Sequence, residues 1–579
     1  MATKCAQNQF ALRVSDALLR VRQLNDLWPP NAGIWTRIGK ANRRAKLTLQ
    51  QLGEAPMKLD ADLLDLTAPE FIVMSKFGCG MPIKYEQFHA TLKTIGLPLS
   101  PQKVREALHL LDFKHVEDNP ILVKWSERLQ EPELNGEETA KLKASVCDEH
   151  EASRSLFVGR AYAIDSKETS EVDDAVSLEV DDAGNEWIHV HSADLTRYIP
   201  EDSPAHALAA ERVRTHYLPE VVVPMIPRFL GQVASLQENK ACPALTCSVR
   251  LSGDGSVLDY RVHCTSVVDV KRATYHQVER FLEAQAVGWA STDSCRGIPE
   301  AEFQLPPWFE EEDAKVLRRL ADLSILRLEH RRRNGAKAVE TIKCKLAVSP
   351  DPGAFDSEIV ISGSEKDCPA ARWLIAELML LAGWVAASYA CEHAIAVPYR
   401  ADRLMDSSGP PDVQPSLHLK ASAPGPGQDI VASYEKLELT SKASYCLSPM
   451  PHSSVGFDKY LQVTSPIRRY NDMLAHYQLK RHLLTGKHKE TSWVKAWAKN
   501  LNQRSDDDAR MQRQSTRHWL LEHLRRASLE DPHVVYECVV LSTEDTRASP
   551  VDEGASHPLV SRLLFTDFGL VKAVWHSDP

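Results

Sequence analysis

The sequence lacks any pair of cysteines in the CxxC spacing that structural zinc sites and redox motifs use. Its 12 cysteines are scattered, and several lie in apolar stretches, among them Cys247, Cys391 and Cys538. This usage argues against a disulfide framework and against a zinc site. It favours buried, reduced thiols in a reducing compartment, which leaves the cytoplasm and an organelle (chloroplast or mitochondrion) open.

Long hydrophobic runs are also missing. The longest, such as 378–387, are shorter than the roughly 20 residues that a helix needs to cross a bilayer. We therefore expect no membrane association. The N-terminus has arginines at helical spacing, which leaves an organellar transit peptide open, although serine is sparse and Asp16 interrupts the pattern.

An excess of positive charge is absent too, since the formal net charge is −10. Net charge governs solubility and steering, whereas nucleic-acid binding depends on where the charges lie. The basic residues gather in three groups: Arg327, Arg331, Arg332, Arg333 and Lys337; Arg468 and Arg469; and Arg510, Arg513, Arg517, Arg525 and Arg526. A single group would be explained by a solvated helix face. Three groups on an acidic chain predict a basic channel.

The length of 579 residues exceeds one ordinary hydrophobic core and predicts about two to four domains. The fold class that we predict is α+β and multidomain. We expect five parts: a variable segment (1–60), a small helical or winged-helix module (61–127), a charged linker (128–154), a mixed α/β body (155–530) and a partial OB-type barrel (531–579).

The most informative stretch is AIDSKETSEVDDAVSLEV, residues 163–180. An apolar, strand-like run ends at Asp165, and the other three acids, Glu171, Asp173 and Asp174, follow a loop and precede a second alternating run. Acids are disfavoured in strands and buried carboxylates are costly, so four of them here need partners. Hard divalent cations such as magnesium, with manganese as the alternative, are natural ones. An acidic surface turn remains the simpler explanation of this stretch by itself.

Two further segments predict helices. In TSPIRRY (464–470), Pro466 suits the first turn of a helix with a basic face. The segment 505–526 has Ser505 as a plausible N-cap, three acids in its first turn and arginines in its last, as the helix dipole favours.

An Asp followed at +6, +8 and +9 by three more acids resembles the signature of the RNase II (RNB) family. The resemblance continues in order through HYLPEVVVPMIP (216–227), RRRNGA (331–336) and TSPIRRY, and the wording is closest to the cyanobacterial and organellar branch. It covers roughly residues 155–530, which would be the RNB catalytic domain. The acidic signature and TSPIRRY lie about three hundred residues apart, so chance agreement on both is improbable.

The resemblance implies an exoribonuclease that hydrolyses single-stranded RNA from its 3′ end to nucleoside 5′-monophosphates by two-metal magnesium catalysis. Asp165, Glu171, Asp173 and Asp174 would hold the metals, and Asp173 and Arg468 would be catalytic. Tyr217 would stack on the base at the 3′ end. Arg469, Arg331, Arg332 and Arg333 would contact RNA. We expect a monomer and leave a larger RNA-processing assembly open.

The chain also departs from the family pattern. Position 171 is Glu where many members have Asp, and Arg513 stands where well-studied bacterial members have a glutamate that assists catalysis. No cold-shock type strand is evident near the N-terminus. Arg513, the missing cold-shock barrels and a terminal barrel that looks short motivate an alternative, a catalytically weak or inactive RNB-fold subunit that binds RNA or serves in assembly. Retention of the four acids and Arg468 argues against it. A phosphohydrolase acting on small nucleotides is a weaker third hypothesis.

Overall fold

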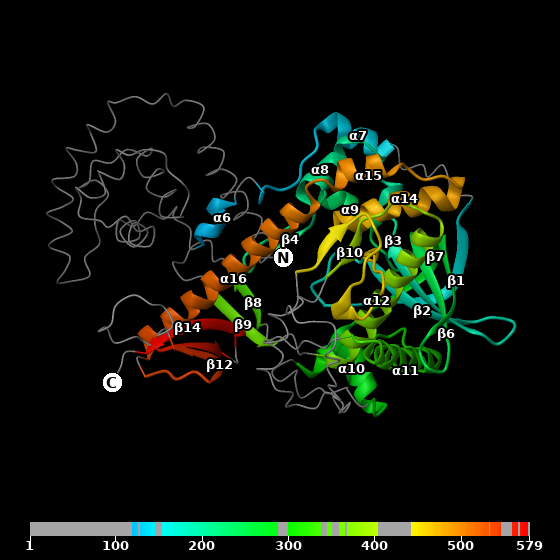
Figure 1. Ribbon diagram of the computed structural model, residues 1–579. Helices are drawn as coiled ribbons and strands as arrows, with labels where there is room; N and C mark the ends of the chain where they lie inside the picture. The colour runs from blue at the N-terminus through cyan, green and yellow to red at the C-terminus, as the bar shows by residue number, and fades with distance from the viewer. Residues whose placement is uncertain are drawn as a thin grey trace, which may run out of the picture.

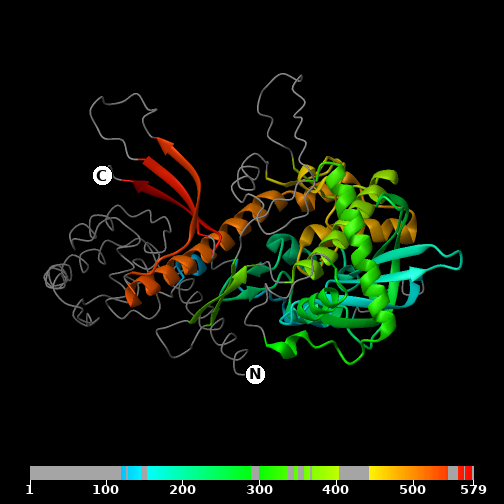
Figure 2. The same cartoon turned by 90° about the horizontal axis from the view of Figure 1, so that it is seen from below.

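The structure is a computed structural model that describes residues 119–125, 128–144, 153–287, 299–336, 344–349, 358–364, 368–402, 442–531, 533–545, 559–565 and 568–576 (Figures 1 and 2). The expected segment 1–60 and nearly all of the expected winged-helix module lie outside these residues. Of that module the structure describes α6 (Pro120–Lys124) and its flanks.

A closed five-stranded barrel lies at the centre of the mixed α/β body. Its strands, in barrel order, are β1 (Ser155–Asp165), β2 (Asp174–Val180), β3 (Glu186–Ala193), β6 (Cys242–Leu251) and β7 (Val257–Thr274). Neighbouring strands are antiparallel except β1 and β7, which are parallel and close the barrel. Asp165 ends β1 opposite Thr274, and Asp174 begins β2 opposite Ser192. The acidic loop therefore leaves and re-enters the barrel between two paired strands.

Helices and short strands surround the barrel. The helices are α8 (Pro204–Arg212), α9 (Arg228–Ala234), α10 (Tyr275–Ala284), α11 (Glu311–Arg333), α12 (Pro369–Glu392), α14 (Tyr470–Thr485), α15 (Thr491–Ala498) and α16 (Leu501–Glu530), with 3-10 turns η4 (Leu195–Arg197), η6 (Glu300–Phe303) and η7 (Ser453–Val455). Two-stranded pairs are β4 (His216–Tyr217) with β5 (Val222–Val223), β8 (Cys344–Ser349) with β9 (Glu358–Ser364), and β10 (Tyr399–Ala401) with β11 (Ser444–Cys446). One core lies between the barrel and α10–α12, and a second between the barrel and α8, α9 and α14.

Helix α12 is longer than the apolar run that is visible in the sequence. By length and composition it could cross a membrane, but 67% of its most apolar window is buried inside the protein. A core helix of a soluble protein passes the same test, so this observation is weak support for a membrane span. At Gly383 a Cβ would lie 2.6 Å from the Leu461 carbonyl oxygen, which shows how tightly α12 packs.

Helix α16 begins earlier than the sequence predicts. Its N-cap is Asn500, so the prediction that Ser505 caps the helix is wrong, and Ser505 is buried inside it. The reason is packing: Asp508 faces the β4 strand and is hydrogen-bonded to His216, while Met511 packs against Leu122 and Leu218. The acids of 506–508 therefore lie in the second turn of a longer, docked helix.

The C-terminal strands β12 (Cys538–Asp545), β13 (Leu559–Phe565) and β14 (Leu570–His576) form an antiparallel sheet. It is open in the part of the chain that is described, so the OB-type barrel remains a prediction. The far end of α16 packs between this sheet and the β8–β9 hairpin, through Leu520, Phe568 and Leu346. Figure 1 shows α16 running from the catalytic body to this sheet.

The expected charged linker, whose composition equally allows a surface helix, contains a helix, α7 (Gly136–Ala144), and its Leu142 is buried against the body. The expectation about the cysteines needs correction. Of the cysteines expected to be buried, Cys247 is, whereas Cys391 is exposed and Cys538 is only partly covered. Both Cys391 and Cys538 lie near the ends of apolar segments, where burial is incomplete.

The barrel encloses polar side chains among its apolar ones. His191 is fully buried, and its ring nitrogens lie 2.8 Å from Ser177 Oγ and 2.9 Å from Thr246 Oγ1. Burial, with His189 and His263 nearby, lowers the pKa of His191 well below 6.5. The imidazole is therefore neutral in the folded protein over a pH range in which an unfolded chain would protonate it.

Acidification should therefore destabilise the barrel. Because the folded pKa of His191 is depressed, its contribution to stability is complete above pH 6.5 and is lost as the pH falls below that value. We expect a loss on the order of 2 kcal/mol between pH 7 and pH 5 from this residue. Urea unfolding of the wild type and of His191→Asn at both pH values measures the difference. An equal pH dependence in both proteins would contradict the assignment.

Candidate active site

The acidic loop is held by main-chain hydrogen bonds. Ala193 N–H donates to the Asp173 carbonyl at 2.7 Å, and Leu236 N–H donates to the Val172 carbonyl at 3.0 Å. Val172 N–H donates to Ser235 Oγ at 2.6 Å. The end of β3 and the residues after α9 thus fix the loop. The main chain therefore positions the acids, and contacts of their side chains are not needed for this.

Asp173 meets the second motif directly. Its carboxylate accepts from Ile467 N–H at 2.9 Å and from Arg468 Nε at 3.1 Å, across 295 residues of sequence. The Asp173 side chain is 4% exposed, whereas that of Arg468 is 42% exposed and also donates to Ser465 Oγ at 2.9 Å. The structure therefore brings together the two residues expected to be catalytic.

The TSPIRR segment is a turn and not a helix. Helix α14 begins at Tyr470, so the prediction that Pro466 starts a helix is wrong. The buried Asp472 carboxylate accepts from Ser465 N–H and from Arg469, and Thr215 N–H donates to the Arg468 carbonyl at 3.0 Å. These contacts hold the turn and leave Arg469 after it in an extended conformation, with φ of −136°.

The same contacts determine the position of Tyr217. The 213–215 segment that pairs with 468–470 leads into β4, whose last residue is Tyr217. Its side chain is 46% exposed. Burial raises the pKa of Tyr217 to about 12, with Arg468 opposing the rise and Asp173 adding to it. An aromatic ring with an accessible face thus lies beside the Asp173–Arg468 pair.

The acids repel one another and are poorly solvated. Burial raises the pKa of Asp174 to about 8, and Asp165 and Asp173 add to the rise. Burial also raises the pKa of Glu171 to about 7 and that of Asp173 to about 6, although Arg468 opposes the latter. The pKa of Asp165 is raised by burial against the opposing charge of Arg272. Without a bound cation, Asp174 is therefore largely protonated at neutral pH and Glu171 is partly protonated.

The donor set suits a hard divalent cation. In the described ranges no three carboxylate, histidine or cysteine side chains form a group that could by itself hold a metal ion. Magnesium does not need one, because it is usually held by one or two carboxylates together with waters and substrate phosphates. Asp174, whose pKa is raised by Asp165 and Asp173, and Glu171, whose pKa is raised by Asp173, are carboxylates of the kind that such an ion would use.

Glu171 has its longer side chain accommodated by a glycine. A Cβ at Gly231 of α9 would lie 2.3 Å from Glu171 Oε1 and 2.8 Å from its Cδ. The carboxylate therefore lies on the bare backbone of α9. Arg228, at the start of α9, counters the rise in the Glu171 pKa and forms an ion pair with Glu131.

The arginines of 331–333 do not line the same centre. Arg331 is buried, forms a bidentate ion pair with Glu377 and donates to the Val455 carbonyl at 2.6 Å, and its expected contact with RNA remains a prediction. Arg333 is exposed and donates to the Asp254 carbonyl. Arg332 is only partly exposed. Contact of Arg332 and Arg333 with RNA remains a prediction.

Arg513 lies on an exposed position of α16, whereas Asp508, Met511 and Ser515 face inward. Several supporting residues were not identified from the sequence, among them Asp472, Ser235 and Gly231. The short SPIRRYND spacing of Asp472 could have indicated a contact with the turn before it. Gly231 and Ser235 carry no local signal, because their role depends on α9 lying against the acidic loop.

Comparison with known proteins identifies the family. Residues 154–485, more than half of the chain, match the RNB domain family. The chain belongs to that family. The family resemblance expected from the acidic signature and TSPIRRY is thus confirmed, as is the mixed α/β character of the fold, whereas the expected division into domains remains a prediction. The match ends at the last residue of α14, before α16.

Curated relatives carry related names. The chain is 29% identical to an uncharacterized ribonuclease of Synechocystis sp. over 63% of its length and 49% of the relative's. It is 28% identical to the chloroplastic/mitochondrial ribonuclease II of Arabidopsis thaliana, over 72% of this chain and 46% of that protein. It is 26% identical to the mitochondrial exoribonuclease DSS-1 of Trypanosoma brucei brucei, over 78% and 69%. The chain thus spans about half the length of the first two.

Solved structures share the fold. The Dss1 exoribonuclease of Candida glabrata aligns with a TM-score of 0.68 and 19% identity, over 92% of this chain and 67% of that one. The RNase R of Mycoplasma genitalium in complex with single-stranded RNA aligns with a TM-score of 0.57 and 18% identity, over 80% and 70%. At these identities the likeness establishes a mixed α/β RNB fold.

Metal binding should depend strongly on pH. The raised pKa values of Asp174 and Glu171 mean that, without metal, their stabilising effect is complete at low pH and is lost as the pH rises through 7 to 8. Cations bind the ionised acids, so magnesium or manganese should raise the melting temperature by several degrees more at pH 8.5 than at pH 6. Thermal melts with and without metal measure this. A pH-independent shift, or an unchanged shift in Asp174→Asn, would argue against metal binding there.

Gly231→Ala should displace the Glu171 carboxylate without unfolding α9, because alanine favours a helix by about 1 kcal/mol over glycine. We expect that a higher metal concentration will be needed to produce the same rise in melting temperature. The double variant Gly231→Ala with Glu171→Asp should recover, since the shorter side chain withdraws from the added methyl group. If the double variant does not regain the wild-type response of the melting temperature to metal, a clash between the added methyl group and the Glu171 carboxylate is not the cause.

Proposed function

We propose that this chain is a metal-dependent exoribonuclease that hydrolyses single-stranded RNA from the 3′ end and releases nucleoside 5′-monophosphates. The observation that carries the proposal is the contact of Arg468 with Asp173, which unites the two family motifs in one centre. The names of the curated relatives, which include ribonuclease II and exoribonucleases, support the reaction class.

Asp165, Glu171, Asp173 and Asp174 would hold the divalent cations, with magnesium as the proposed ion. When bound, such ions supply a water nucleophile at neutral pH and stabilise the leaving oxygen. The acids themselves need to be ionised for this role, and their raised pKa values make the loaded state depend on pH.

Arg468 would bind the scissile phosphate. The Nε of Arg468 donates to Asp173, and one of its Nη atoms donates to Ser465 Oγ. These contacts fix the plane of the guanidinium and leave its exposed edge available to a phosphate. A planar, preorganised guanidinium stabilises charge that develops on phosphate oxygens. Asp173 is thus both a proposed metal ligand and the residue that orients Arg468.

Tyr217 would stack on the terminal base. Its exposed ring lies on a hairpin that is fixed to α16 through His216 and Asp508, so the ring needs little ordering on binding. Stacking of this kind is worth about 1–3 kcal/mol per base and tolerates any base. It supports a substrate of single-stranded RNA without strong sequence preference.

The alternative is an inactive RNB-fold subunit that binds RNA or serves in assembly. Yeast Ssd1, described as a pseudonuclease, shares the fold with a TM-score of 0.51, and the exposed Arg513 replaces the family glutamate. The retained acids and the Asp173–Arg468 contact favour the enzyme, because an inactive subunit gains nothing from buried carboxylates that repel one another.

Asp174→Asn should abolish hydrolysis and leave RNA binding nearly unchanged, because it removes a metal ligand while the Asp173–Arg468 pair stays intact. Single-stranded RNA labelled at its 5′ end is incubated with wild type, Asp174→Asn and the exposed control Asp182→Asn, with magnesium, manganese or a chelator.

Wild type and Asp182→Asn should shorten the RNA progressively and release mononucleotides only with metal. An RNA band that the wild type shifts but does not shorten in the presence of metal would support the alternative, an inactive subunit that binds RNA. Loss of binding together with hydrolysis in Asp174→Asn would contradict the metal role.

A further inference from the structure

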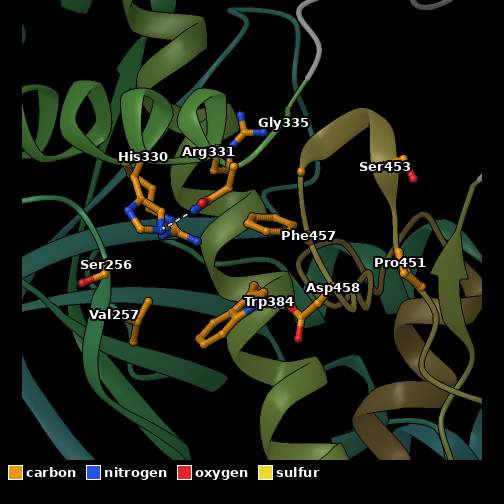
Figure 3. Close-up of a pocket in the computed structure, with 13 residues that line it drawn as sticks. Ser256, Val257, His330, Arg331, Gly335, Trp384, Pro451, Ser453, Phe457 and Asp458 are labelled. Carbon is orange, nitrogen blue, oxygen red and sulfur yellow. Dashed lines mark hydrogen bonds between the residues drawn. The ribbon is translucent and has the colours of Figure 1, made fainter. Parts of the chain in front are cut away.

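A cavity of about 610 Å³ lies beside the C-terminal half of α11, away from the acidic loop. Its walls come from α11, α12, the start of β7 and the loop at 451–458 (Figure 3). The residues that matter for its chemistry are Arg327, His330, Arg331, Trp384, Phe457 and Asp458. None of the four acids, Arg468 or Tyr217 lines it, so it is distinct from the candidate active site.

Arg327 is a buried cation for which the described part of the chain supplies no ion-pair partner. It is 4% exposed, its Nη1 donates to the Gly255 carbonyl at 2.9 Å, and its Nε has no hydrogen-bond partner. No carboxylate of the described residues lies within ion-pair distance of it, in contrast to Arg331, which is neutralised by Glu377. A buried, unpaired guanidinium is costly and favours binding of an anion.

The charged groups around Arg327 are otherwise occupied. Asp254 accepts from Ser252 and Ser256, and Asp458 accepts from Lys459 and from Trp384 Nε1. Burial, with the charge of Arg331, lowers the pKa of Arg327 to about 10, although Glu377 and Asp254 oppose this. The guanidinium therefore keeps its positive charge at neutral pH and faces the cavity without a full counter-charge.

Aromatic rings border the same space. Figure 3 shows Trp384, Phe457 and His330 around the hollow of the pocket. The Trp384 ring is held by its hydrogen bond to Asp458 at 3.0 Å and by the edge of Tyr260, and both Arg327 and Arg331 lie over the Phe457 ring. Rigid aromatic walls suit a flat heterocycle, because bases stack on them irrespective of sequence.

We propose that this cavity binds a nucleoside monophosphate, with its phosphate on Arg327 and its base against Trp384. A guanidinium matches phosphate oxygens in geometry and charge. The cavity volume lies within the roughly 300–1,000 Å³ of small-molecule sites. This site needs no catalysis and stands independently of the proposed hydrolysis. It would give the protein a second place to bind a mononucleotide.

Calorimetric titration of the full chain in chelator tests the proposal, with AMP, adenosine and inorganic phosphate as separate ligands. AMP should bind at least tenfold more tightly than either fragment. Arg327→Met should weaken AMP binding at least tenfold, and Trp384→Leu should weaken it several-fold. The matched control is Arg319→Met on the same helix, where Arg319 pairs with the surface residue Glu186 and is outside the cavity. It should bind AMP as the wild type does.

Two results would overturn the proposal. One is AMP binding that survives both Arg327→Met and Trp384→Leu but is lost in Arg468→Ala, which would place the nucleotide in the candidate active site. The other is phosphate binding as tight as that of AMP, which would show an anion site without nucleotide recognition. If Arg327→Met does not fold, the half-buried Trp384→Leu decides, and unchanged AMP affinity in it contradicts the assignment.

Discussion

The candidate site depends on buried carboxylates that repel one another and are nevertheless held together. Asp173 ends a loop whose main chain is bonded to the end of β3 and to the residues after α9, and Asp174 begins β2, so the barrel compensates for their repulsion. Side chains alone would move such charges apart or protonate them. The rigidity of the scaffold therefore sets the electrostatic properties that make a cation site plausible.

Much of this arrangement could be inferred from sequence because its signals are local. The strand ending at Asp165 and the strand starting at Asp174 follow from alternating apolar residues, and the structure places both where the pattern predicts. The TSPIRR motif indicated a partner for the acids. The predicted helix start at Pro466 is wrong, because contacts from Asp472 and Thr215 override the local preference. Thr215 is distant in sequence, and no local pattern predicts the contact of Asp472.

Other features could not be predicted because they arise only when segments meet. The basic run at 331–333 reads as one group, yet packing against α12 assigns Arg331 to an internal ion pair and leaves Arg333 at the surface. The end of the same helix carries Arg327, whose isolation from carboxylates is visible only in three dimensions. The charge pattern of a helix thus does not determine which of its cations are available to a ligand.

One long helix connects two distant parts of the molecule. Near its start α16 is bonded through Asp508 to His216, the neighbour of Tyr217, and near its end it packs on the C-terminal sheet through Leu520 and Phe568. Because α16 is a single continuous helix, a shift of the terminal sheet would also move Asp508. A partner that bound the terminal sheet could in this way change the position of the Tyr217 ring without contacting the barrel.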